Sequence, residues 1–506
     1  MTDKERMIGL QYISTRGGSD HLRSAQAILK GIAGNGGLYV PEEIPTITAS
    51  WLEKLTTLTY RERALAVLRL FLTDYSESEL QECLAAAYSK DKFSHDDVAP
   101  LSILQNDTSI LELWHGPTSA FKDMALQLLP QLVSTALKKT GETAQIAILT
   151  ATSGDTGKAA LAGFQDVGQT KIIVFYPHNG VSAIQRLQMV TQEGANVAVG
   201  AVEGNFDDTQ NGVKAIFNDP AFNAELAEHG FHLSSANSIN WGRLAPQIVY
   251  YFSAYAELMN QGMIKSGDKV NFVVPTGNFG NILAGYYAWS MGLPVNKLIC
   301  AANSNHVLTD FLQTGTYDRQ RPFHKTLSPS MDILISSNLE RLLYHATGGD
   351  SQQVSEWMIQ LATGGSYTID QDLHTKLQSL FWASWADDSQ TKDVIGEVFS
   401  SFGYTCDPHT AVAWRVGQEY RRQTGDQTHT VIVSTASPFK FNDAVLTALG
   451  QEEPGGDEFA ALEALSQFIG WPVPAPLAEL AAKPILHTQG CAKEEMASFV
   501  RKILVK

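Results

Sequence analysis

The chain has 506 residues, of which 44% are hydrophobic and 18% charged, a composition typical of a globular protein with several domains. Its formal net charge of −16 argues against general binding to nucleic acid or anionic membranes, although a local basic pocket for a phosphate is still compatible with it. The four cysteines, Cys83, Cys300, Cys406 and Cys491, lie far apart without a CxxC pair, so we expect free thiols and neither zinc ligands nor disulfides. The sequence contains no signal peptide and no apolar run of about 18 residues, so we expect a soluble, cytoplasmic protein.

Helices dominate the predicted N-terminal part, which we delimit as a domain of residues 1–100. Residues 22–45 predict a helix, a glycine stop and an extended segment. Residues 60–72 and 76–89 predict amphipathic helices, and Ser76 has the position of an N-cap for the second.

Short apolar runs rich in β-branched residues alternate with helices from about residue 145 onwards. The predicted strands are 145–152, 171–177, 196–204, 231–235, 269–276 and 297–304, and the predicted helices are 158–168, 182–194, 243–262 and 281–292. Such alternation predicts an α/β fold with parallel sheets that are covered by helices.

The last third of the chain is predicted to be mostly helical over residues 325–400 and to return to a strand at residues 431–439. Ser337 and Glu340 have the spacing of a capping box, so we expect a helix to begin there. An acidic, Gly- and Pro-rich loop then precedes a helical tail, which we delimit as residues 451–506.

Two turns between a strand and a helix have the composition of anion-binding loops. Residues 277–281, Gly-Asn-Phe-Gly-Asn, allow backbone N–H groups to converge at a helix N-terminus, which suits a phosphate. Residues 151–161, ATSGDTGKAAL, suit a carboxylate or phosphate but lack the spacing of a P-loop. An ordinary turn remains the alternative for the first loop, and an N-cap at Ser153, Asp155 or Thr156 is the alternative for the second.

Lys122 and Thr435 are further candidate site residues. Lys122 follows Phe121 in HGPTSAFKDMALQ (115–127), where it is either a solvated lysine at a helix start or an amine held in a pocket. Thr435 follows an apolar strand and either faces the ligand crevice of a parallel sheet or only turns the chain. A lysine, a phosphate loop, an anion loop and a hydroxyl at a strand end together are the groups that a pyridoxal phosphate site requires.

These segments resemble motifs of the threonine synthase family, whose members are fold-type II pyridoxal phosphate enzymes with the tryptophan synthase β-like fold. The resemblance rests on HGPTSAFKDMALQ, TSGDTGKA, NSINWGRLAPQIVYYF (238–253), PTGNFGNILAGYYA and STASPFKF, together with ISTRGG and GLYVPEEIP near the start. It covers roughly residues 10–445. It implies a catalytic region of residues 101–450, built from two α/β subdomains with the active site between them, after an N-terminal domain of the family's type.

The resemblance also implies a role for each candidate residue. The cofactor is pyridoxal 5′-phosphate, with no metal, and Lys122 forms the imine and serves as the base. The cofactor phosphate is cradled by Gly277, Asn278, Phe279, Gly280 and Asn281, and Thr435 meets the ring nitrogen. The substrate carboxylate is bound by Ser153, Gly154, Asp155 and Thr156, whereas Arg243 takes the substrate phosphate and Asn240 orients either group. Asp155 stands where related enzymes often have Asn, and Ser437 where many threonine synthases have His, so neither inherits that residue's contact.

The implied reaction is that of a carbon–oxygen lyase, in which O-phospho-L-homoserine and water give L-threonine and phosphate. The expected partners are this small-molecule substrate and, at most, a second copy in a homodimer. Three alternatives stay open: an O-phosphohomoserine phospho-lyase that releases a keto acid and ammonia, a serine or threonine dehydratase, and a non-catalytic sensor of pyridoxal phosphate or amino acids. Lys122 argues against the sensor, and product analysis separates the enzymes.

Overall fold

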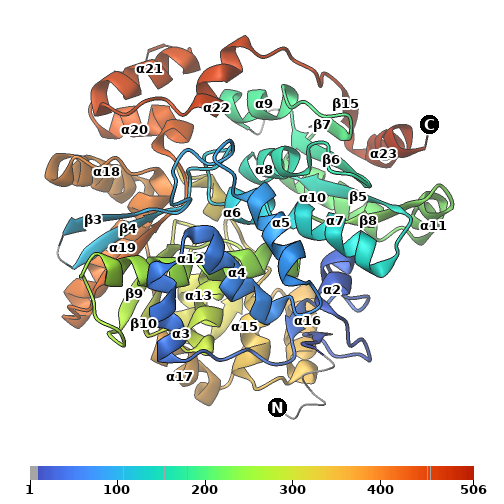
Figure 1. Ribbon diagram of the computed structural model, residues 1–506. Helices are drawn as coiled ribbons and strands as arrows, with labels where there is room; N and C mark the ends of the chain where they lie inside the picture. Colours follow the sequence, from blue (N-terminus) through green and yellow to red (C-terminus); the bar gives the residue numbers. More distant parts are fainter. Residues whose placement is uncertain are drawn as a thin grey trace.

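Two β-sheets form the framework of the molecule, as the computed structural model shows (Figure 1). It describes residues 9–505 except 106, 153, 179, 180, 453 and 456, and it leaves out the side chains of residues 206 and 207. Among these residues no helix has the length and apolarity that crossing a bilayer requires.

The six-stranded sheet is parallel except at one edge. Its order is β13 (Phe381–Trp385), β10 (Val295–Ala302), β9 (Val270–Pro275), β14 (Thr430–Ser434), β4 (Thr108–Glu112) and β3 (Leu101–Gln105). Only the edge pair β3–β4 is antiparallel. Every residue of β9 and β14 is buried, as expected for apolar strands that have helices on both faces.

The five-stranded sheet is parallel throughout. Its order is β15 (Gly490–Ala492), β7 (Val197–Glu203), β6 (Thr170–Pro177), β5 (Gln145–Ala151) and β8 (Phe231–Ser234). The predicted strands and helices between residues 145 and 304 are thus confirmed, within a few residues at their ends.

Helices surround both sheets (Figure 1). Those after residue 120 are α6 (Asp123–Leu126), α7 (Leu129–Thr140), α8 (Asp155–Phe164), α9 (Ala183–Val190), α10 (Phe206–Phe217), α11 (Pro220–Glu228), α12 (Trp241–Asn260), α13 (Gly280–Met291), α14 (Val307–Thr314), α15 (Leu339–Ala346), α16 (Ser351–Gly364), α17 (Gln371–Leu380), α18 (Asp388–Phe402), α19 (Pro408–Thr424), α20 (Asn442–Ala448), α21 (Glu458–Ile469), α22 (Ala475–Ala478) and α23 (Met496–Leu504).

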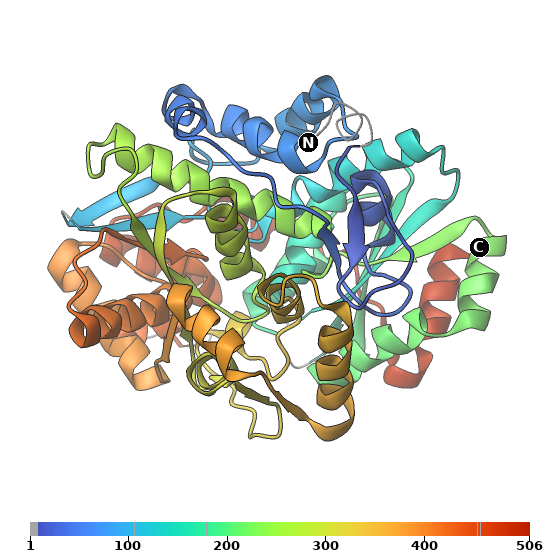
Figure 2. The ribbon, with the colours of Figure 1, turned by 90° about the horizontal axis from the view of Figure 1, so that it is seen from below.

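The N-terminal part is mainly helical, as predicted. It contains β1 (Tyr12–Ser14), α2 (Ser24–Lys30), β2 (Tyr39–Pro41), α3 (Ala49–Lys54), α4 (Tyr60–Phe71) and α5 (Glu77–Ala87). Its helices lie across the front of the molecule in Figure 1 and along the upper edge in Figure 2. Gly31 ends α2 with a φ of +71°, and the Ser76 hydroxyl accepts a hydrogen bond from the backbone N–H of Glu79.

Glu340 joins the N-terminal part to the rest of the chain. Its carboxylate accepts hydrogen bonds from Arg16 Nε and Nη2, at 2.9 and 2.8 Å, and from the Thr15 hydroxyl. The capping-box prediction is therefore wrong: α15 has Asn338 as its N-cap residue, and Ser337 instead donates to Asn278 Oδ1. Glu340 pairs with Arg16 and does not cap the helix, because the guanidinium donates two charge-assisted hydrogen bonds to its carboxylate.

Two short strands depart from the sequence prediction. β13 lies within residues 325–400, predicted mostly helical, and forms the edge of the larger sheet. β15 lies in the C-terminal tail, predicted helical, and adds to the edge of the smaller sheet beside β7. Both are edge strands of at most five residues, and their pairing depends on a neighbouring strand far away in sequence.

Candidate active site

The candidate residues converge where strands of the two sheets end. The loops after β4, β9 and β14, three adjacent strands of the larger sheet, supply residues 115–122, 277–281 and 435–437. The loop after β5 of the smaller sheet supplies residues 152, 154 and 155. α6, which follows Lys122, lies between the two sheets in Figure 1. The carboxyl ends of parallel strands commonly face a ligand crevice, and here they do so from two sheets.

Lys122 is buried, with 8% of its surface exposed, which excludes the alternative of a solvated surface lysine. Backbone hydrogen bonds tie its segment to the segment after β14: Phe121 N–H donates to Thr435 O, and Ser437 N–H donates to Ser119 O. The Lys122 amine lies 3.1 Å from Ser330 Oγ and 5.0 Å from the centre of the Phe121 ring. Distant parts of the chain therefore fix the position of this amine.

Asp155 lies between two lysines. Its carboxylate is 2.6 Å from Lys440 Nζ and 3.6 Å from Lys122 Nζ. Burial alone raises the pKa of Asp155, but Lys440 and Lys122 outweigh burial and hold the pKa well below its usual range. Lys440 also donates to Thr118 O at 2.9 Å, so it stabilises the loop that leads to Lys122.

The Lys122 amine is poised to lose its proton. Burial lowers its pKa, and Asp155 opposes this shift. The nearby cations Lys440 and Arg243 lower the pKa further. An amine of this kind is neutral at a lower pH than a solvated lysine, which suits both reaction with a carbonyl and general-base chemistry.

Ser330 connects the Lys122 amine to a buried Asp–His pair. Ser330 Oγ lies between Lys122 Nζ and Asp155 Oδ2, at 3.1 and 3.4 Å. Its backbone N–H donates to His409 Nε2 at 3.2 Å, so His409 Nδ1 carries a proton and donates to Asp407 at 2.6 Å. The sequence analysis missed Ser330, His409 and Lys440.

The loop at 277–281 offers free backbone donors. No described residue accepts a hydrogen bond from the backbone N–H groups of residues 277–281. Phe279 has a φ of +64° as the N-cap residue of α13, and this turn directs the loop into the helix start. A Cβ at Gly277 would lie 2.7 Å from the carbonyl oxygen of Ser330, so the close approach of these two segments requires glycine.

Asn281 holds its side-chain amide in one orientation. Its Oδ1 accepts from the hydroxyls of Tyr250 and Tyr251, at 2.6 and 2.9 Å. The Nδ2 is buried and has no partner among the described residues. An unpaired buried donor is costly unless a ligand satisfies it, so Asn281 supports an acceptor-rich ligand at this loop.

The loop after β5 is shaped by its glycines and Thr152. Gly154 has a φ of +142°, and a Cβ there would lie 2.4 Å from the Gln185 side chain. Thr152 Oγ1 accepts from the N–H groups of Gly154 and Gly157, at 2.9 and 3.0 Å. The N-cap alternative is wrong for Asp155 and Thr156, because Gly154 is the N-cap residue of α8 and the Thr152 hydroxyl accepts the free N–H of Gly157 in its first turn. Ser153 lies outside the described residues.

Arg243 and Asn240 lie at the start of α12. Arg243 is 4% exposed and donates to Ala236 O at 2.9 Å, while its Nε has no partner and no carboxylate pairs with it among the described residues. Burial lowers the pKa of Arg243 to about 10. The side-chain amide of Asn240 donates to Ile28 O and accepts from Gly242 N–H, at 3.0 and 2.8 Å. It thus caps α12 and contacts α2, and its role towards the substrate stays a prediction.

Thr435 and Ser437 flank the loop that follows β14. Thr435 is 5% exposed, and its hydroxyl has no hydrogen-bonding partner within the described part of the chain. Ser437 has a structural contact instead: its Oγ accepts from the N–H of Phe439 at 3.4 Å. Of these two hydroxyls, the one without a partner, that of Thr435, is the one available to a ligand.

Three protein-family models match the chain. "Threonine synthase N terminus" matches residues 11–88, "Pyridoxal-phosphate dependent enzyme" matches residues 108–369, and "Threonine synthase, C-terminal" matches residues 410–470. A threonine synthase from Pseudomonas aeruginosa is 43% identical over 444 residues, which cover 87% of this chain and 91% of that protein. Human "Threonine synthase-like 1" is 42% identical over 440 residues, 85% of this chain. The chain spans 58–62% of the length of the primate threonine synthase-like 1 proteins that it matches.

Solved structures agree with these matches over nearly the whole chain. A pyridoxal-phosphate-bound threonine synthase from Brucella melitensis has a TM-score of 0.87 at 38% identity, with 98% of this chain and 100% of that chain covered. Threonine synthase from yeast has a TM-score of 0.87 at 34% identity, with 98% of each chain covered. The chain therefore belongs to the threonine synthase family of pyridoxal-phosphate-dependent enzymes.

Proposed function

We propose that this protein is a threonine synthase, which converts O-phospho-L-homoserine and water into L-threonine and phosphate. The observation that carries the proposal is Arg243, a buried guanidinium without a carboxylate partner whose charge acts on Lys122. A site with such a cation, in addition to a separate phosphate loop, is suited to a substrate that brings its own phosphate. The family membership and the matches at both ends of the chain support the same activity.

The donors around Lys122 fit pyridoxal phosphate. Lys122 would hold the cofactor through its aldehyde, the free N–H groups of residues 277–281 and the unpaired Asn281 Nδ2 would bind its phosphate, and the Thr435 hydroxyl would bond its ring nitrogen. When bound, the cofactor supplies an electron-withdrawing ring that stabilises negative charge on the substrate's α-carbon. A neutral hydroxyl as the nitrogen's partner leaves that nitrogen largely unprotonated, which suits elimination and replacement better than transamination.

Two different groups near the amine are proposed to bind the two anionic ends of the substrate. Backbone N–H groups of Asp155 and Thr156, at the start of α8, suit the substrate carboxylate, because the Gly154 N–H already donates to Thr152 Oγ1. The side chain of Asp155 is already paired with Lys440 and repels a second carboxylate, so we assign it to the lysines and not to the substrate. Arg243 takes the phosphate, and binding there provides the partner that its guanidinium lacks.

Lys122 moves the protons. With the substrate bound, its neutral amine would take one proton from the α-carbon and one from the β-carbon. Phosphate would leave from the γ-carbon, the hydroxyl of water would add at the β-carbon while the water's proton goes to the phosphate, and Lys122 would return its two protons to the substrate carbons. Ser330 Oγ both accepts from a charged amine and donates to a neutral one, so it holds Lys122 Nζ in either state. Burial lowers the pKa of this amine, which keeps enough of it neutral to act as a base.

Product analysis tests the proposed reaction directly. The purified protein is supplied with O-phospho-L-homoserine, and phosphate, threonine and 2-oxobutyrate are measured together. Equal amounts of phosphate and threonine are expected. Phosphate with 2-oxobutyrate and ammonia would identify a phospho-lyase instead, and turnover of unphosphorylated serine or threonine would identify a dehydratase.

Borohydride reduction tests the role of Lys122. The protein as isolated should be yellow, with an absorbance maximum at about 410–420 nm. Borohydride reduction should then attach the cofactor covalently to Lys122. Lys122→Ala should lose this attachment, while Lys139→Ala, a lysine paired with Glu79 away from the site, should keep it. Full attachment in Lys122→Ala would refute the assignment.

We further propose that the chain has three domains, of residues 1–100, 101–450 and 451–506. We also propose that the protein is cytoplasmic and is a monomer or a homodimer. The four free, buried cysteines support a reducing compartment.

A further inference from the structure

A second cavity lies beside the loop that carries Lys122. Its volume is about 770 Å³, within the range that holds small metabolites. The walls come from the loop after α5, the segment 114–119, α8, the end of α9 and the segment 471–483. None of the side chains proposed to hold the cofactor or the substrate lines it.

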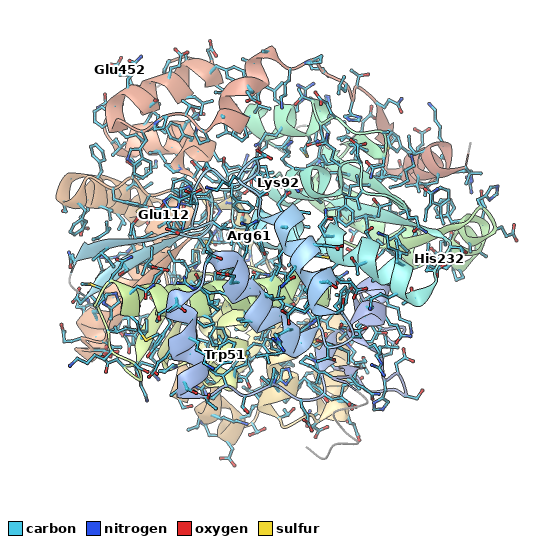
Figure 3. All side chains as sticks on the ribbon, viewed as in Figure 1. Trp51, Arg61, Lys92, Glu112, His232 and Glu452 are labelled. Carbon is cyan, nitrogen blue, oxygen red and sulfur yellow. The ribbon has the colours of Figure 1, made fainter. Side chains whose placement is uncertain are left out.

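The inner wall of this cavity carries two lysines without an ionic partner. Lys92, labelled in Figure 3, and Lys158 are partly buried, and within the described ranges no carboxylate forms a salt bridge with either. Lys158 Nζ is held by the neutral Gln192 Oε1 at 2.5 Å. Burial lowers the pKa of Lys92, and it lowers the pKa of Lys158 to about 8. The buried carboxylate of Asp123 acts on both lysines and raises their pKa, but it forms no salt bridge with either within the described residues, so both amines stay available to an anion in the cavity.

The other charged residues of the lining stand at its exposed rim. Lys90 and Lys483 are exposed and paired with Asp96 and Glu479, at 2.7 and 3.7 Å. The acidic lining residues Asp91, Glu193 and Glu479 are all exposed. The partly buried charged side chains of the lining are therefore the two lysines, with Asp123 buried behind the wall, whereas the rim carries both signs of charge.

Gln127 adds an unsatisfied polar group to the same cavity. It has no exposed surface, and neither Nε2 nor Oε1 has a hydrogen-bonding partner among the described residues. It is the C-cap residue of α6, the helix that begins after Lys122. A buried amide with both atoms unpaired destabilises the fold unless a ligand or water satisfies it.

Flat rings form a further part of the wall. Trp114 stacks on His115 with ring centres 4.2 Å apart, and Trp471 lies nearly parallel to Trp114 at 6.1 Å and 22°. Trp114 belongs to the catalytic region and Trp471 to the C-terminal tail, and both line the cavity. Such rings offer a surface on which a planar group stacks.

We propose that this cavity is a second small-molecule site, separate from the catalytic site, for a ligand that joins a phosphate or carboxylate group to a planar ring. Lys92 and Lys158 bind the anion, the Gln127 amide, which is covered in this structure, turns to bind a polar group of the ligand, and Trp114 and Trp471 contact the ring. The loop at 116–119 forms part of this wall and leads to Lys122, so the ligand contacts the element that positions the catalytic amine.

Calorimetric titration of the holoenzyme with ADP and with pyrophosphate tests this proposal. ADP should bind once per chain and more tightly than pyrophosphate, which lacks the ring. Lys92→Gln and Lys158→Gln should each weaken ADP binding at least about tenfold, the effect of losing one charge-assisted contact. Lys139→Gln removes the same charge from a surface lysine and should leave ADP binding unchanged.

Gln127→Leu and Gln188→Leu separate binding from folding. Gln188 is equally buried and has two unpaired amide atoms, but it does not line the cavity. Both variants should be at least as stable as the parent, whereas only Gln127→Leu should weaken ADP binding. Binding that is insensitive to Lys92 and Lys158, that is lost in Arg243→Gln, or that is absent for both probes at millimolar concentration would overturn the proposal. Equal affinity for ADP and pyrophosphate would overturn the role of the rings.

Discussion

Replacing Asp155 with Asn tests how the pKa of Lys122 is set. The substitution keeps the size of the side chain and an oxygen for Lys440, but it removes the negative charge 3.6 Å from the Lys122 amine. Asp155 raises the pKa of Lys122, so Asp155→Asn should lower it further. The substitution leaves two buried cations without a counter-charge, so it should also destabilise the fold by about 3–5 kcal/mol.

The size of the pKa change follows from the distance. At 3.6 Å and an effective dielectric constant of about 20, the attraction between the two charges is about 4–5 kcal/mol, or about 3 pKa units. This is an upper bound, because Asp155 also compensates Lys440 and because the variant site relaxes around the lost charge. We therefore expect the pKa of Lys122 to fall by about one to three units.

Rebinding of pyridoxal phosphate to the apoprotein reports this pKa. Only the neutral amine reacts with the aldehyde, so the rate of colour formation falls as pH drops through the pKa of Lys122. In Asp155→Asn this fall should move to lower pH, whereas in Lys440→Met it should move to higher pH, because Lys440 lowers the pKa of Lys122. Asp426→Asn, in a hydrogen-bond network with Asn271 at the opposite end of β9, serves as a control and should not shift it. An unchanged or raised pKa in a folded Asp155→Asn variant would refute the reasoning.

Three further predictions concern other parts of the site. Gly277→Ala places a methyl 2.7 Å from Ser330 O, so cofactor affinity, measured by titration of the apoprotein, should fall at least about tenfold; unaltered affinity would mean that the two segments separate freely. Arg243→Gln should lower kcat/KM for O-phospho-L-homoserine about 10- to 150-fold while cofactor affinity stays the same, and a loss confined to the cofactor would contradict its assignment. Burial raises the pKa of Asp123 to about 6, so its contribution to stability is complete below about pH 4 and about 3 kcal/mol is lost as pH rises through 6. Urea unfolding of Asp123→Asn should therefore show a flatter pH dependence between about pH 4 and 7, and an equally steep one would count against this pKa.

The sequence predicted the loops of the site because each follows a strand with a strong local pattern. Residues 277–281 and 154–157 combine small residues with a strand before and a helix after, and these properties are local. Their meeting at one place also follows from the fold, since parallel strands bring their carboxyl ends to the same edge of a sheet. The resemblance to a known family supplied the assignment of roles.

The residues that the sequence analysis missed have no local pattern of this kind. Ser330 lies in a short 3-10 turn, Pro329–Met331, and reaches Lys122 only through tertiary contacts across 208 positions. Lys440 lies within STASPFKF, a segment that the sequence singled out only for the hydroxyl of Thr435. The role of Lys440 depends on its contact with Asp155, which is distant in sequence. Asn240 and Arg243 stand in one motif, but the structure separates their contacts: the Asn240 amide donates to Ile28 O, whereas Arg243 Nε has no partner among the described residues.

The arrangement around Lys122 explains how one amine serves first as an anchor and then as a base. A lone carboxylate beside a lysine would raise the lysine's pKa and keep it protonated near neutral pH. Asp155 avoids this because its nearer partner is Lys440, at 2.6 Å, so much of its charge is compensated before it acts on Lys122. Burial then remains the largest influence on the pKa of Lys122 and lowers it. Ser330 adds a hydrogen bond without adding charge, so the amine keeps its position when its proton leaves.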